Sequence, residues 1–140
     1  YSVIKKYPSS IDIIINQTEF LAQFKKNGKD YFLGSNWKII EIANFKIDIP
    51  FLYGEFKVKD FIKLKKAIDE TNFNYNEVKN LYFFKSGRWD VETSSGLIVK
   101  LPNKNIKKSL QLVTEILKNN NQNNILKIDL RQKNQIIING

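Results

Sequence analysis

The run Arg88-Trp89-Asp90-Val91-Glu92-Thr93, residues 88–93, decides the fold class of this 140-residue chain. Successive side chains of a β-strand point to opposite faces, so Trp89, Val91 and Thr93 lie on one face and the charged residues between them lie on the other. This alternation predicts a strand that buries one face and leaves the other face polar.

The segments on both sides of this run predict an antiparallel sheet. Residues 77–84 and 97–101 are rich in aromatic and branched residues, which favours strands. The turn sequences Ser86-Gly87 and Ser94-Ser95-Gly96 connect them to the central run, and both are short enough for hairpins. We therefore expect three consecutive strands that pair in chain order.

Two helices are predicted to pack on this sheet. Residues 58–70 and 106–118 change to apolar residues at every third or fourth position, which is the helical period. The stripe of the second helix is expected in the core and consists of Ile106, Leu110, Val113 and Leu117. From the strand alternation we also expect Tyr82 and Phe84 in the core.

Strands are also predicted in the N-terminal third. Residues 3–16 read as a hairpin around a Tyr-Pro-Ser-Ser turn, and residues 20–33 as a second hairpin with Asn27-Gly28 as its turn. Residues 37–42 form a further strand, and Ile49-Pro50 breaks the pattern. The whole order predicts an α+β fold, a mostly antiparallel curved β-sheet with two packed helices.

The last predicted hairpin carries one of the two arginines among the chain's 23 cationic residues. It runs from residue 125 to Arg131, turns at residues 132–134 and returns over residues 135–139. Arginine offers a planar fork of donors that binds carboxylates at two points, and a terminal hairpin exposes a sheet edge that can pair with another chain. Both features favour a docking surface.

Composition narrows the function classes. The chain has no histidine, no cysteine and no glycine-rich phosphate loop, so common catalytic and metal-binding groups are absent from it. A net charge of +9 raises a basic nucleic-acid-binding domain as the alternative function, although the lysines are spread along the chain. No apolar run reaches the roughly 20 residues of a membrane span.

Four stretches, taken in order, resemble the extracytoplasmic part of the FtsQ/DivIB family of bacterial division proteins. They are spread over nearly the whole chain, and their order and spacing carry the resemblance. The stretches are Tyr7-Pro8-Ser9-Ser10-Ile11-Asp12-Ile13 running on to Leu21-Ala22, Ile49-Pro50-Phe51-Leu52-Tyr53-Gly54, Trp89 through Gly96 to Leu101-Pro102, and Ile128-Asp129-Leu130-Arg131.

This resemblance implies a non-enzymatic scaffold in the division machinery, without cofactor, small-molecule substrate or nucleic-acid partner. Residues 1–17 would be the last strands of a POTRA domain, and residues 18–140 would be the family's β domain. Such proteins cross the inner membrane once, upstream of this region, and act on its periplasmic side at the division septum. Their partners there are FtsB and FtsL.

The resemblance and the residues both place partner binding at the closing hairpin. An incoming strand would pair with the returning strand, while Arg131 clamps a carboxylate on it. For Arg131 the alternative is a simple pair with Asp129 on a solvated surface. For Arg88 the alternatives are a second cation of the partner surface and a solvated strand position. The expected partner-binding residues are Arg131, Gln132, Gln135, Ile136, Ile137, Ile138 and Arg88; the family often has an aromatic residue in place of Gln132.

Overall fold

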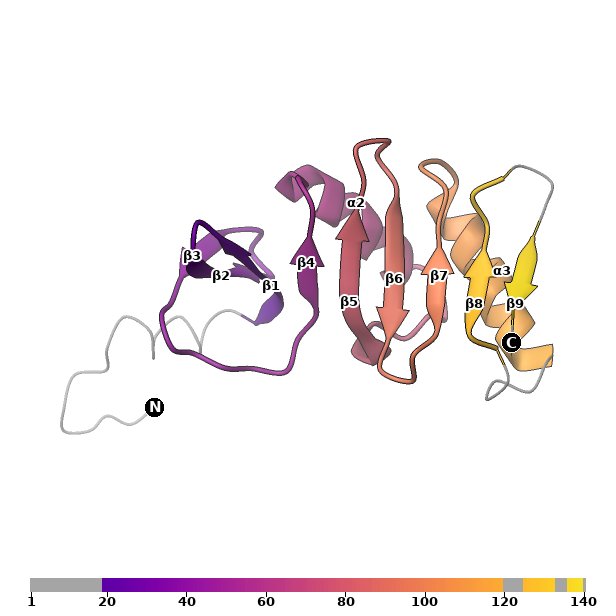
Figure 1. Ribbon diagram of the computed structural model, residues 1–140, viewed down its shortest axis with the longest axis horizontal. Helices are drawn as coiled ribbons and strands as arrows, with labels where there is room; N and C mark the ends of the chain where they lie inside the picture. The colour runs from indigo at the N-terminus through magenta and orange to yellow at the C-terminus, as the bar shows by residue number, and fades with distance from the viewer. Residues whose placement is uncertain (1–18, 120–124, 133–135, 140) are drawn as a thin grey trace. The chain divides into compact units, whose positions relative to one another are not determined.

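The computed structural model describes residues 19–119, 125–132 and 136–139 (Figure 1). The chain divides into two compact units, with the division between Ile49 and Pro50. The hairpin expected at residues 3–16 and the domain boundary expected between residues 17 and 18 lie outside the described residues, so both stay predictions.

The first unit is a three-stranded antiparallel sheet of β1 (Phe20–Lys26), β2 (Lys29–Gly34) and β3 (Ile39–Glu41), with β2 in the middle. Asn27 and Gly28 join β1 to β2 with positive φ angles of 54° and 78°. That pair of angles is typical of the tight hairpin turn that an Asn-Gly sequence favours. The predicted hairpin is therefore confirmed, and the third strand is shorter than expected.

A small aromatic core holds the first unit together. It contains Phe20, Phe32 and Ile42, with Ile40, Phe45 and Ile49 packed against it. The buried Gln23 side chain donates hydrogen bonds to the carbonyl oxygens of Ile47, at 3.1 Å, and of Ile49, at 3.0 Å. These bonds hold the segment after β3 against β1.

The second unit contains one sheet in the order β4-β5-β6-β7-β8-β9. Its strands are β4 (Phe51–Tyr53), β5 (Val78–Phe83), β6 (Trp89–Thr93), β7 (Ile98–Lys100), β8 (Lys127–Asp129) and β9 (Ile137–Asn139). Neighbours pair antiparallel, except that β4 pairs parallel with β5 and β7 pairs parallel with β8. A helix lies between the two strands of each parallel pair in sequence, as a parallel connection requires.

These helices are α2 (Val58–Asp69) and α3 (Ile106–Asn119), and both lie behind the strands of the second unit in Figure 1. The carboxylate of Asp60 accepts a hydrogen bond of 2.8 Å from the Lys57 backbone N–H at the start of α2. Apolar residues of both stripes are buried, among them Phe61, Leu64, Ile68, Ile106, Leu110 and Val113. The α+β class with mostly antiparallel strands and two helices is confirmed.

The central strand behaves as its sequence predicts. Trp89 is 1% exposed and packs its ring 4.8 Å from that of Phe83, centroid to centroid. Two expected core residues lie outside the core, because Phe84 is 39% exposed and Tyr82 is only half-buried. The buried face of β5 is the face that carries Leu81. Tyr82 and Phe84, one and three residues later, point to the opposite face.

Candidate partner-binding edge

The closing hairpin forms as predicted, between β8 and β9. The two strands are antiparallel, with Lys127 opposite Asn139, Ile128 opposite Ile138 and Asp129 opposite Ile137. Strand β8 also pairs with β7, whereas β9 is the last strand of the order, with no strand beyond it in the described part of the chain. An edge strand presents N–H and C=O groups on its outer side, which another chain can use.

The side chains of this edge are apolar and exposed. Ile136, Ile137 and Ile138 are 45%, 37% and 45% exposed, and Leu126, just before β8, is 59% exposed. Ile128, which Ile138 faces across the hairpin, is buried. The hairpin is thus anchored through β8 and offers apolar side chains along β9. Gln135 lies outside the described residues, and Gln132 is exposed.

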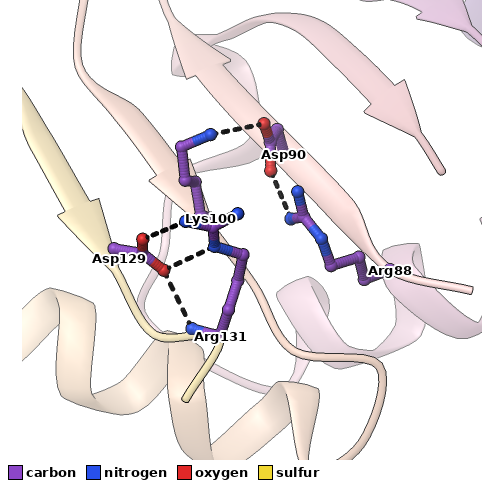
Figure 2. Close-up of polar contacts among 5 residues, drawn as sticks. All are labelled: Arg88, Asp90, Lys100, Asp129 and Arg131. Atoms are coloured by element: carbon purple, nitrogen blue, oxygen red, sulfur yellow. Dashed lines mark hydrogen bonds and ion pairs between the residues drawn. The ribbon is translucent and has the colours of Figure 1, made fainter. Parts of the chain in front are cut away.

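The Arg131 guanidinium binds the Asp129 carboxylate through two hydrogen bonds (Figure 2). Its Nε donates to Asp129 Oδ1 at 2.9 Å and its Nη2 to Oδ2 at 2.6 Å, while its backbone N–H donates to Oδ1 at 3.0 Å. The hydrogen bonds from the guanidinium hold the pKa of the Asp129 carboxyl below its usual value, against the effect of burial. The expected pair is present, but its carboxylate is buried rather than solvated.

The pair leaves part of the Arg131 side chain accessible. The side chain of Arg131 is 45% exposed, against 9% for that of Asp129. A guanidinium carries five N–H donors, and the two side-chain bonds to Asp129 do not exhaust them. Pairing with Asp129 and binding of a partner carboxylate are therefore compatible, and partner binding by Arg131 stays a prediction.

Arg88 is more enclosed than a solvated strand position would be. Its Nη1 donates to Asp90 Oδ1 at 2.5 Å, and its guanidinium carbon lies 4.3 Å from the ring centroid of Phe84. Its side chain is 14% exposed, so the expected solvated strand position is wrong. A role of Arg88 on a partner surface stays a prediction.

Arg88, Asp90, Lys100, Asp129 and Arg131 form a polar cluster (Figure 2). The sequence did not indicate two of its members, Asp90 and Lys100, as site residues. Lys100 on β7 places its Nζ 3.4 Å from Oδ2 of Asp90, so Asp90 is held by two cations. The hairpin turn at residues 94–96 sets a register in which Asp90 faces Lys100, and that signal could have found the pair. The parallel register that sets Lys100 beside Asp129 has no such local signal.

Metal-ligating side chains do not gather in the part of the chain that the structure describes. Within these ranges, no group of three or more Asp, Glu, His or Cys side chains is arranged to hold a metal ion.

No helix within these same ranges has the length and apolar character needed to cross a membrane.

Comparison with known proteins decides the family. The family model described as "Cell division protein FtsQ/DivIB, C-terminal" matches residues 22–131, which is most of the chain. The chain belongs to the FtsQ/DivIB family. It is therefore a member of a cell division family, as the four stretches predicted. The matched residues end at Arg131, two residues after β8 and before β9.

Individual FtsQ/DivIB relatives are distant. The chain is 19% identical over 144 aligned residues to the cell division protein FtsQ of Bradyrhizobium diazoefficiens, an alignment that covers 98% of this chain. The chain spans 41% of the length of that curated relative. Among solved structures, the major extracytoplasmic domain of DivIB from Geobacillus stearothermophilus matches with a TM-score of 0.49 and 13% identity, covering 74% of this chain and 97% of the DivIB chain.

Proposed function

We propose that this chain is a docking module of the division machinery that binds an FtsB/FtsL-type partner by β-strand addition at β9. The observation that carries the proposal is the exposure of Ile136, Ile137 and Ile138 along the last strand of the sheet. In strand addition, main-chain hydrogen bonds supply affinity and alternate side chains supply specificity. An apolar edge strand provides both kinds of contact.

Arg131 supplies the charged contact in this proposal. Asp129 faces Ile137 across the hairpin and binds Arg131, so Arg131 is held two residues beyond the end of β8, the strand that flanks the edge. Charged contacts at a partly exposed position mainly set orientation and association rate. A partner strand with a carboxylate that reaches the exposed side of the guanidinium would be fixed in register by it.

The family membership supports the wider setting of the proposal. We infer a non-enzymatic role on the periplasmic side of the inner membrane, at the division septum. An upstream membrane span and a POTRA domain that ends near residue 17 belong to the same proposal.

The test is binding of the C-terminal periplasmic peptide of the same organism's FtsB, measured by fluorescence anisotropy. We expect saturable binding that Arg131→Glu weakens by at least about tenfold, since a charge-assisted bond becomes a repulsion. Ile137→Lys should weaken it as strongly. The matched control is Ile39→Lys, because Ile39 is a similarly exposed strand isoleucine, 43% exposed, in the first unit.

Strand addition itself is tested on the peptide. In an added strand, every second residue directs its N–H group to the sheet. N-methylation of these residues should therefore abolish binding, and N-methylation of the residues between them should not. Equal effects at both sets of positions would contradict strand addition, and no saturable binding would overturn the proposed function. Affinity for DNA or RNA that falls steeply with salt would support the basic nucleic-acid-binding alternative instead.

A further inference from the structure

One row of paired residues crosses five strands of the second unit. Tyr82 on β5 faces Asp90 on β6, Asp90 faces Lys100 on β7, Lys100 faces Asp129 on β8, and Asp129 faces Ile137 on β9. Residues paired across neighbouring strands project from the same face of the sheet. The row therefore runs from β5 to the edge proposed for docking.

The charges in this row alternate. Lys100 faces Asp90 and Asp129 across its two neighbouring strands and forms its ion pair with Asp90, and each carboxylate has an arginine on its own chain segment, Arg88 for Asp90 and Arg131 for Asp129 (Figure 2). Two anions and three cations thus form one cluster in which Lys100 is the middle member. Its charge also helps to keep the pKa of Asp129 low, after the larger effect of Arg131.

The two carboxylates and Lys100 are largely shielded from solvent, so their charges are screened less than those of fully exposed side chains. The side chains of Asp90, Asp129 and Lys100 are 10%, 9% and 21% exposed. Loss of the lysine charge would leave two shielded carboxylates roughly 10 Å apart, two strand spacings, with no cation between them. Asp129 and Arg131 would then be linked to the centre of the sheet only by the weaker attraction between Arg131 and Asp90.

We propose that Lys100 is a positioning residue for the docking edge, holding Asp129 and through it the guanidinium of Arg131 in the orientation that a partner carboxylate binds. This inference rests on the proposed function of β9. Lys100 acts from β7, which pairs in parallel with β8 and so connects the hairpin to the sheet. It makes no contact with the partner strand itself.

The first measurement needs no partner. In the free protein, the Nε–H of Arg131 should exchange with solvent about fivefold faster or more in Lys100→Met than in wild type, because its acceptor is less well fixed. Lys100→Arg keeps the charge and should restore slow exchange. Lys127→Met removes a lysine from β8 itself, next to the edge, and should leave the exchange rate unchanged. Unchanged exchange in Lys100→Met would overturn the positioning role.

The second measurement uses the FtsB peptide in a double-mutant cycle. Lys100→Met should weaken binding about fivefold in the wild-type background and have almost no effect in Arg131→Met, because it acts through Arg131. Equal losses in both backgrounds, or an equal loss in Lys127→Met, would show general electrostatics or unfolding instead and overturn the proposal. If wild type does not bind the peptide at all, the proposed function fails, and the exchange rates still decide the role of Lys100.

Discussion

Gly54 lies where β4 and β5 approach too closely for a side chain. It follows Tyr53, which pairs with Tyr82 in the parallel register, and a Cβ at Gly54 would overlap the carbonyl oxygen of Phe83 and lie 3.1 Å from its carbonyl carbon. Its φ angle is +102°, which L side chains rarely adopt. Because the clash is with backbone, it can be relieved only by separating the ends of the two strands.

We expect Gly54→Ala to lower the free energy of unfolding by about 2–6 kcal/mol. Strained backbone contributes about 1–3 kcal/mol of this and overpacking a similar amount. Gly96→Ala is the matched control, because Gly96 has a φ of +95° but no heavy atom lies within 4 Å of the place that an alanine methyl group would take. It should therefore show the backbone strain alone, about 1–3 kcal/mol.

Urea denaturation followed by tryptophan fluorescence measures both variants, since the buried Trp89 reports on the same sheet. Midpoints are compared at constant m-value, so that a change in midpoint reports a change in stability. Equal destabilisation by Gly54→Ala and Gly96→Ala would refute the argument from the Phe83 carbonyl, because the close approach would then add nothing to the cost of the φ angle.

Two further stability predictions follow from burial and charge. Arg131→Met should be less stable than wild type at neutral pH, and this difference should shrink as the pH falls through the depressed pKa of Asp129. The reason is that a carboxyl whose pKa is lowered by folding stabilises the protein only while it is ionised. Urea denaturation at several pH values between about 7 and 2 measures the difference, and a difference that grew in acid would contradict the prediction. Leu110→Ala should cost about 2–5 kcal/mol, because Leu110 is 0% exposed in α3, whereas Leu126→Ala, at a 59% exposed position, should cost less than about 0.5 kcal/mol in the same assay.

Local sequence patterns were sufficient to predict the elements that bury an apolar face over several consecutive turns or residues. Helix α2 was expected at residues 58–70 and forms Val58–Asp69, because its apolar stripe covers three turns. The hairpin of β1 and β2 follows from Asn27-Gly28, whose backbone preferences fit the turn. In these elements the residues that set the structure lie within a few positions of one another.

Strand β4 was missed for the opposite reason. Phe51–Tyr53 is three residues long and follows a proline, so it has no readable period, and it is a strand because β5, more than 20 residues later, pairs with it in parallel. The parallel pairing of β7 with β8 was missed in the same way, since it is established across α3. Parallel connections leave no turn signal in the sequence.

In the candidate site, too, local contacts were predictable and contacts between distant strands were not. The hairpin and the pair of Asp129 with Arg131 are local, two residues apart, and were predictable. The place of Lys100 between Asp90 and Asp129 depends on one hairpin register and one parallel register, so only half of it could be inferred. Phe84 was misplaced because the alternation was counted without the burial of Leu81 to fix its phase.

The composition of the edge strand also favours docking. Natural sheets protect their edges with charges, most often lysine, because a bare edge templates pairing with other chains. Here 21 of the 23 cationic residues are lysines, yet residues 135–140 read Gln-Ile-Ile-Ile-Asn-Gly and contain none. A chain with lysine at so many positions has exposed isoleucines on this edge strand, Ile137 and Ile138, and a third, Ile136, just before it. An edge of this kind is suited to being covered, and Arg131 lies beside it, where the proposed partner carboxylate would bind.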